Sequence, residues 1–222
     1  MTSLAARSAV GPAARPRLRG LLHAAGAPVA VVLGVVLVLL ANSLRERTGV
    51  AVYAASLTGL FTVSAVYHRG RWRPAVKRWL QRVDHSMIFL LIAGTYTPFC
   101  LLVLAGSTSW IVLSIVWGGA IIGIVARLTW ASAPRWFFVP LYLGLGWVAA
   151  AVAPALAAGA STTANLLLVL GGVLYSVGAV VFATRRPDPA PEVFGFHEVF
   201  HALTVAAAAC HAAALTLVLV QG

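Results

Sequence analysis

The stretch GFHEVFHALTVAAAACHAAALTLVLV at positions 195–220 decides the fold. It is a continuous apolar run that is long enough to cross a lipid bilayer as one α-helix. Near its start, the residues HEVFH at positions 197–201 place two imidazoles and a carboxylate at the N-terminal end of that helix. Ionisable groups are costly inside a membrane and are kept there mainly for function. We therefore expect a transmembrane helix with a functional site at one end.

Further apolar runs of similar length precede this one, at about 21–43, 49–68, 84–105, 109–128, 136–158 and 163–183. The mean hydropathy is +0.94 and only 9% of the residues are charged, which excludes a soluble globular protein. The runs are too continuous for the alternating strands of a membrane β-barrel. The sequence thus predicts an all-α membrane protein, a bundle of seven transmembrane helices. We assign residues 20–222 to this single domain and residues 1–19 to a basic, disordered cytoplasmic arm.

The basic residues predict the orientation of the bundle. If the N-terminus is cytoplasmic, all of the 16 Lys and Arg residues except Arg45 and Arg47 fall on the cytoplasmic side. The positive-inside rule therefore favours a cytoplasmic N-terminus and an outside C-terminus. The net charge of +11 then reflects topology and contact with anionic lipids, not a nucleic-acid partner. We expect a multi-pass protein of the plasma membrane whose partners are membrane lipids, with no indication of its oligomeric state.

Four potential metal ligands share one predicted membrane depth. His68 closes the second helix, Asp84 opens the third, and His197 and His201 open the seventh, all at the cytoplasmic side. Residues four apart on a helix lie roughly 6 Å apart, so His197 and His201 can reach one ion. Three neutral imidazoles and a water form a tetrahedral catalytic zinc site. The sequence predicts Zn²⁺ on the three histidines; the alternative is separate interfacial histidines bonded to backbone or headgroups.

Three polar residues in or beside this cluster have two interpretations each. Asp84 is predicted to hold and deprotonate a zinc-bound water, or else to cap its helix or pair with Arg82. Ser64 lies one turn deeper than His68 and bonds within the site or to substrate, or else to its own i−4 carbonyl. Glu198 completes the H-E-x-x-H pattern of zinc proteases, where it is the general base. However, it points about 100° away from His197, so it can instead face the loop arginines.

The other histidines are less informative. His23 begins the first helix at the same depth and either supports the site or caps the helix at the interface. His85 neighbours Asp84 but need not point the same way. His211 follows His201 by ten residues, about 15 Å along a helix, which is too deep for the same ion. We expect His211 to form a hydrogen bond between helices.

At these residues the chain resembles the haemolysin III family, the bacterial branch of the progestin and adipoQ (adiponectin) receptor group. The family pattern S-x3-H, then Asp, then H-x3-H is met by Ser64 and His68, by Asp84, and by His197 and His201, within residues 18–220. The resemblance implies a seven-helix fold with a cytoplasmic N-terminus, zinc on the three histidines and a water held by Asp84.

The resemblance also implies candidate activities. Relatives are associated with hydrolysis of ceramide-type amides, while the bacterial name comes from red-cell lysis and a proposed pore. The chain departs from eukaryotic relatives in two places. Only His23 matches the motif that these relatives carry before the first helix. Glu198 stands where they tend to have a non-acidic residue. A shared substrate therefore does not follow from the resemblance.

Three classes of function compete. The first is an intramembrane zinc hydrolase that acts on a lipid amide or ester, with Asp84 and Ser64 as catalytic residues and an acyl chain held among the helices. The second is a pore or cytolysin in which zinc is structural. A pore requires polar residues through the full bilayer depth, and only scattered Thr, Ser and His211 lie outside the cytoplasmic cluster. The third is a lipid sensor of membrane state without turnover. The residue pattern favours the hydrolase over the pore.

Overall fold

The computed structural model describes residues 16–130 and 134–221. These residues form eight α-helices and one 3₁₀ segment: α1 Leu21–Leu40, α2 Leu44–Arg69, α3 Pro74–Leu102, α4 Gly106–Thr129, α5 Arg135–Gly146, the 3₁₀ segment Trp147–Val152, α6 Ala153–Gly159, α7 Thr162–Thr184 and α8 Phe196–Gln221. Seven spans in this described part are long and apolar enough to cross a membrane. The predicted fold class, an all-α bundle of seven transmembrane helices, is confirmed.

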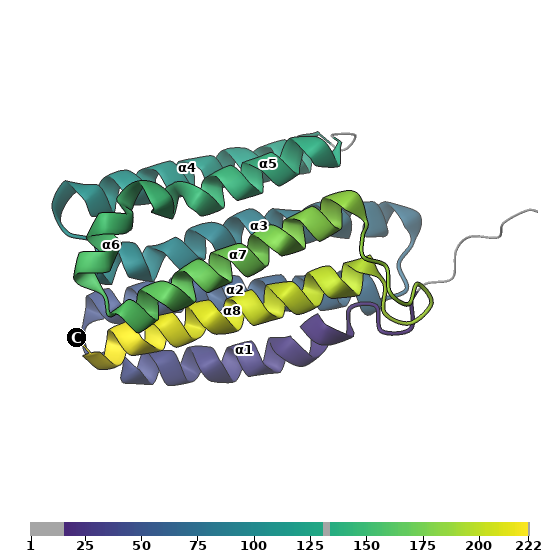
Figure 1. The fold of residues 1–222 in the computed structure, drawn as a ribbon. Coiled ribbons are helices and arrows are strands. Elements are labelled where there is room, and N and C mark those ends of the chain that lie inside the picture. The colour runs from purple at the N-terminus through teal and green to yellow at the C-terminus, as the bar shows by residue number, and fades with distance from the viewer. Residues whose placement is uncertain (1–15, 131–133, 222) are drawn as a thin grey trace, which may run out of the picture.

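The helices lie side by side along one long axis (Figure 1). Helix α2 packs between α1 and α3, α7 packs on α8, and α4 covers the outer side of α3. One core cluster lies among α1, α2, α3, α7 and α8, and a second lies among α3, α4 and α5. Large apolar side chains point outward, such as Leu39 (77% exposed) and Ile122 (71% exposed). Such a surface suits lipid and not water.

Helix α3 begins ten residues before the predicted start at position 84. Pro74 occupies the first turn, where its missing N–H costs no hydrogen bond and its fixed φ favours a helical start. The segment that follows is basic, so its low hydropathy did not indicate a membrane helix. Asp84 consequently lies inside α3 instead of at its N-terminus, and the interpretation of Asp84 as a helix cap is wrong.

The fifth span is not one continuous α-helix. Helix α5 ends at Gly146, and the 3₁₀ segment Trp147–Val152 leads into α6. The Tyr96 hydroxyl from α3 donates a hydrogen bond to the Gly146 carbonyl at 2.6 Å and accepts one from the Ala149 N–H at 2.7 Å. An irregular backbone at membrane depth needs such partners because lipid supplies none.

A turn at residues 16–20 lies against the loop that precedes α8. The Arg17 and Leu18 N–H groups donate to the carbonyls of Glu192 (2.9 Å) and Val193 (3.2 Å). Residues 16–19 of the predicted disordered arm are therefore ordered, because the loop supplies backbone partners; residues 1–15 lie outside the described part. At Gly20, φ is +74°, and an added Cβ would lie 2.6 Å from the Cβ of His68. Only glycine fits both the backbone conformation and this close approach.

Candidate metal centre

The end of α2 and the start of α8 are both fixed by local hydrogen bonds. The Val66 carbonyl in the last turn of α2 accepts from the Gly70 N–H at 3.1 Å and from the Trp72 Nε1–H at 2.9 Å. Before α8, the Asp188 carboxylate accepts from the Phe196 N–H at 2.8 Å. Negative charge at a helix N-terminus is favourable because the helix dipole is positive there. These caps hold the two turns that carry the histidines.

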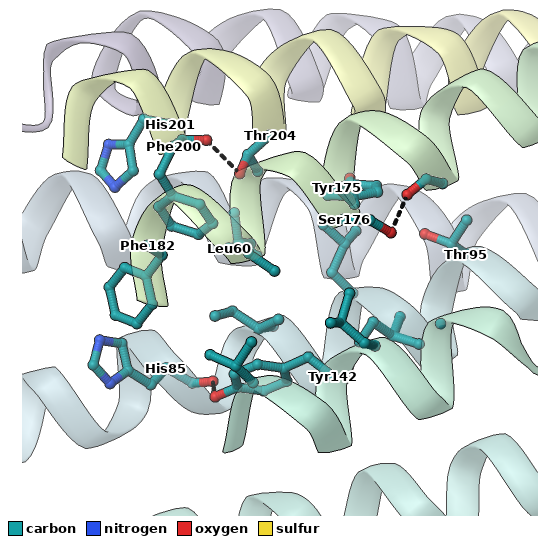
Figure 2. Close-up of a pocket in the computed structure, with 18 of the residues that line it drawn as sticks. Leu60, His85, Thr95, Tyr142, Tyr175, Ser176, Phe182, Phe200, His201 and Thr204 are labelled. Carbon is teal, nitrogen blue, oxygen red and sulfur yellow. Dashed lines mark hydrogen bonds between the residues drawn. The ribbon is translucent and has the colours of Figure 1, made fainter. Parts of the chain in front are cut away.

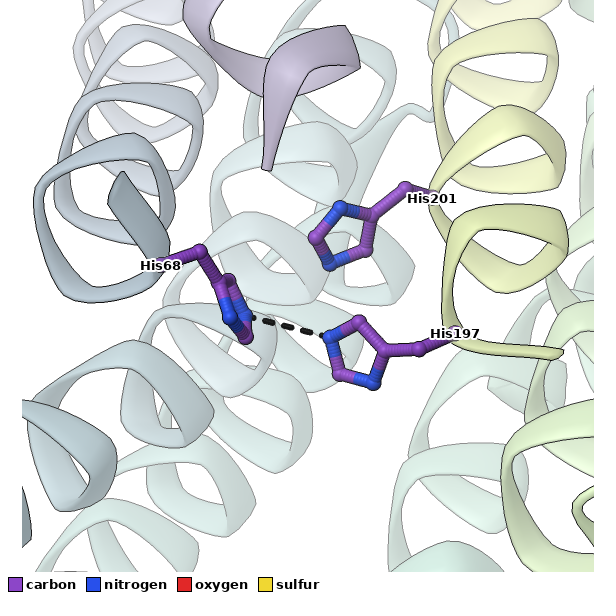
Figure 3. Close-up of side chains that lie close together, drawn as sticks. All are labelled: His68, His197 and His201. Carbon is purple, nitrogen blue, oxygen red and sulfur yellow. Dashed lines mark hydrogen bonds between the residues drawn. The ribbon is translucent and has the colours of Figure 1, made fainter. Parts of the chain in front are cut away.

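His68 from α2 and His197 and His201 from α8 converge on one point (Figure 3). The Nε2 atoms of His68 and His197 lie 3.1 Å apart, and one nitrogen of each ring lies within 4.8 Å of the others. All three side chains are buried. The structure thus brings together the three predicted ligands from elements more than a hundred residues apart in sequence.

The donor set fits a tetrahedral zinc ion. With Zn–N bonds of about 2.05 Å, the nitrogens of two tetrahedral ligands lie about 3.3 Å apart, close to the separation between His68 and His197. The Nδ1 atom of His201 is buried and makes no hydrogen bond to any described residue. Neutral imidazoles grouped this closely are typical zinc ligands. The residues present therefore suit the ion, whose binding stays a prediction.

Asp84, Ser64 and His23 surround the histidines. The Oδ2 atom of Asp84 lies 3.7 Å from the Nε2 atom of His68, and Asp84 is 8% exposed. The Ser64 hydroxyl is 2.8 Å from the His23 Nδ1 atom, so it bonds within the site and not to its own backbone. The His23 ring stacks on that of His201, with centroids 3.8 Å apart and planes 12° apart. The interpretation of His23 as an interfacial cap is wrong, since the ring is buried in the site.

Glu198 points away from the three histidines and toward the N-terminal turn. Its Oε1 atom lies 2.9 Å from the Nε atom of Arg19, and its Oε2 atom accepts from the Gly195 N–H at 3.0 Å. The side chain of Glu198 is 1% exposed and that of Arg19 is 19% exposed. Of its two interpretations, an arginine partner therefore fits and a general base does not, although the partner comes from the arm and not from a loop.

The remaining histidines lie apart from the cluster. His211 Nε2 donates to the Leu168 carbonyl at 3.1 Å, which confirms the predicted hydrogen bond between helices. His85 contacts Arg127 of α4, and its ring meets the edge of Phe182 at a centroid distance of 5.9 Å. The Arg127 guanidinium also lies 4.6 Å above the Phe138 ring. Nothing in the sequence spacing indicated that Arg127 would reach His85.

A cavity extends from the histidines into the bundle (Figure 2). His201, His85 and Phe182 lie at one end, and Thr95, Tyr175 and Ser176 lie at the other. The middle of the cavity is mainly apolar, with walls that include Leu60, Ile88, Leu91, Val139 and Leu143. Asp84 and Tyr96 of α3 both line it, and a separation of twelve residues corresponds to about 18 Å. The cavity therefore reaches across more than half of a hydrocarbon core that is about 30 Å thick.

These features define a class of protein: a multi-pass α-helical membrane protein with a buried three-histidine cluster at one end of an apolar cavity. The family model described as "Haemolysin-III related" matches residues 13–212 of the sequence. The chain therefore belongs to the haemolysin III family.

Individual relatives are bacterial and mammalian. The chain is 33% identical to Hemolysin-3 of Bacillus cereus over 167 residues, which is 74% of this chain and 76% of the relative. It is 35% identical to the Hemolysin-3 homolog of Bacillus subtilis (strain 168) over 135 residues, 61% of this chain and 63% of the relative. It is also 26% identical to the human Monocyte to macrophage differentiation factor over 180 residues, 78% of this chain and 71% of the relative.

Proposed function

We propose that this chain is a plasma-membrane zinc enzyme that hydrolyses an amide or ester bond of a lipid. The observation that carries the proposal is the position of Asp84, which lies beside the three-histidine cluster where that cluster opens into the apolar cavity. The candidate metal ligands, a candidate proton acceptor and the apolar cavity are thus next to one another.

The ion would be held by His68, His197 and His201. Zinc at such a site supplies Lewis acidity, which polarises a substrate carbonyl and makes water more acidic. The Asp84 carboxylate, beside His68, would orient an attacking water, accept its proton and pass that proton to the leaving amine or alcohol. Ser64 and His23 form a hydrogen-bonded pair against the cluster, and stacking of His23 on His201 restrains that ligand's ring.

The cavity supports a lipid substrate. Its apolar middle matches an acyl chain, which would pass into it from the bilayer without exposing apolar surface to water. A carbonyl at the head of that chain would then lie next to the histidines and Asp84. Burial of the site in the bundle excludes bulk water, which strengthens the electrostatic interactions within it.

A second candidate is a lipid sensor in which zinc is structural. The observation that favours it is the origin of the ligands on α2 and α8, because one ion would tie these two helices together. A pore is less favoured because the middle of the cavity is mainly apolar. In the sensor the same lipid would bind, but its carbonyl bond would stay intact.

Metal-dependent turnover separates these candidates. The purified protein is stripped of metal with a chelator, reloaded with one equivalent of Zn²⁺, and assayed with a panel of lipid amides and esters of matched chain length. We expect release of free acyl chains only after reloading, and none from the His68→Ala variant under the same conditions. Binding of the lipids with no zinc-dependent release would reject the hydrolase and leave the sensor.

A further inference from the structure

The three histidines are buried although each lies in a terminal part of its helix. His68 is the second-last residue of α2, and His197 and His201 lie in the first two turns of α8. Their exposed fractions are only 6%, 8% and 2%, respectively. Another part of the chain must therefore cover this end of the bundle.

The N-terminal turn, residues 16–20, provides this cover together with the start of α1. An added Cβ on Gly20 would lie 2.6 Å from the Cβ of His68, so the turn passes directly over that side chain. The Arg19 Nε atom lies 2.9 Å from the Oε1 atom of Glu198 at the start of α8. Figure 3 shows the start of α1 (purple ribbon) next to the histidine cluster. The turn thus contacts both elements that carry the histidines.

The N-terminal turn is held by backbone hydrogen bonds that lie at the surface. The Arg17 N–H donates to the Glu192 carbonyl at 2.9 Å. The Leu18 N–H donates to the Val193 carbonyl at 3.2 Å, and both accepting residues are exposed. The ion pair of Arg19 adds a side-chain restraint. Segments with few buried contacts and solvent-exposed backbone bonds open locally at low free energy, so the turn can open while the helices stay folded.

A metal ion has two directions from which to approach the histidines. One is the cavity, whose middle is lined by apolar side chains such as Leu60 and Ile88. A hydrated divalent cation is excluded from such surroundings because it would lose its water without meeting ligands. The other direction passes the N-terminal turn, where an added Cβ on Gly195 would lie 2.7 Å from an Asp188 oxygen and 3.4 Å from the Glu198 Oε2 atom. Asp188 is exposed and Glu198 is buried, so these carboxylates lead inward from the surface.

We propose that the N-terminal turn is a releasable cover over the metal centre, and that ions in solution reach His68 only when this turn opens. The ion pair of Arg19 with Glu198 holds the cover closed. Opening sets the rates at which metal enters and leaves, while the ligands stay on their helices. This inference rests on the proposed function only for the identity of the ion, because closure by the turn requires neither metal nor turnover.

The first test measures access to the site without metal. His68→Cys, in a background without Cys100 and Cys210, places a thiol directly under Gly20 and removes one ligand. The metal-free protein in lipid nanodiscs is treated with a cationic, membrane-impermeant thiol reagent, and the rate of modification is followed by mass spectrometry. Adding Arg19→Gln should raise this rate about tenfold, because it breaks an ion pair with one buried partner.

Arg17→Gln is the matched control for this test. It removes the same charge from the same turn, but the exposed Arg17 side chain pairs with no carboxylate of the described residues. Its backbone bond to Glu192 is kept. Adding Arg17→Gln should therefore leave the modification rate within about twofold of that of the His68→Cys protein.

A reversible cross-link tests the opposite change with the ion bound. Leu18→Cys and Val193→Cys, at two positions joined by a backbone bond, are linked by a disulfide after the protein has been loaded with zinc. Exchange of the bound zinc for an isotopically labelled ion in solution should be at least about tenfold slower in the oxidised protein than in the reduced protein. Zinc content should be the same in both.

Two outcomes overturn the proposal. Equal modification rates with Arg19→Gln and with Arg17→Gln would show that the ion pair does not hold the turn closed. Zinc exchange that the cross-link leaves unchanged would place the entrance elsewhere. A protein whose turn controls the thiol reagent but which binds no zinc would reject the proposed zinc enzyme and leave the cover standing.

Discussion

The Oδ2 atom of Asp84 on α3 lies 3.7 Å from the Nε2 atom of His68 on α2. The same His68 nitrogen lies 3.1 Å from the Nε2 atom of His197 on α8. One nitrogen thus faces both a second imidazole and a carboxylate. This arrangement gives the site a candidate ligand set and a candidate proton acceptor, and it leads to separate predictions for each.

Zinc content should depend on three histidines and not on a fourth. We expect about one zinc per chain, since three imidazoles bind one tetrahedral ion. His68→Ala, His197→Ala and His201→Ala should each lower the zinc content measured by elemental analysis of the purified protein. His211→Ala is the control and should retain the metal, because His211 bonds to Leu168 at a distance from the cluster. Loss of zinc in the His211 variant alone would contradict the ligand assignment.

Gly20→Ala should weaken both folding and metal binding. The new Cβ would lie 2.6 Å from the His68 Cβ, and the alanine would have to adopt the positive φ of Gly20. We therefore expect a loss of about 2–4 kcal/mol in the free energy of unfolding. Gly106→Ala is the matched control, with a φ of +60° and no atom within 4 Å of the added Cβ. It should cost only about 1 kcal/mol, from the backbone strain, and leave zinc affinity unchanged. Equal effects on zinc affinity would show that Gly20 does not position His68.

Glu198→Gln should act on stability more than on catalysis. The change removes the charge that faces Arg19, and breaking a buried ion pair costs up to about 3 kcal/mol where one partner is partly exposed. Arg19→Gln should cost a similar amount, and the double variant should cost less than the sum of the two, as measured by denaturation. A large loss of turnover in Glu198→Gln with normal stability would instead support the zinc-protease role.

The orientation of the bundle is tested by cysteine accessibility. In a background without Cys100 and Cys210, a cysteine placed at residues 70–73 should be shielded from impermeant thiol reagents in intact cells. A cysteine placed after Leu219 should react. The expectation follows from the distribution of Lys and Arg. The reverse labelling pattern would place the metal centre at the outer face.

The helices and the histidine cluster were predictable because each depends on a regular pattern. Long apolar runs require helices in lipid, and helical spacing places His197 and His201 on one face. The start of α3 was missed because its first residues are basic, and hydropathy marks only the membrane-embedded part of a helix. The prediction that Asp84 lies near His68 is nevertheless confirmed, since both lie at the same end of the bundle.

Contacts made by the N-terminal turn could not be predicted in the same way. The bond between Arg19 of this turn and Glu198 joins residues far apart in sequence. The stacking of His23, in the first turn of α1, on His201 depends on how the irregular segment leads into that helix. No periodic pattern specifies the path of such a segment. The break at Trp147–Val152 is similar, because it depends on the Tyr96 hydroxyl from another helix.

The most direct test of the hydrolase is Asp84→Asn. Asparagine keeps the shape of the side chain but is a poor proton acceptor, so zinc content and thermal stability should stay near those of the wild type. Zinc-dependent release of acyl chains from the best lipid amide should fall by about 10²–10⁴-fold, the usual contribution of general acid–base catalysis. Unchanged turnover in an Asp84→Asn protein that is folded and fully loaded with zinc would contradict the account.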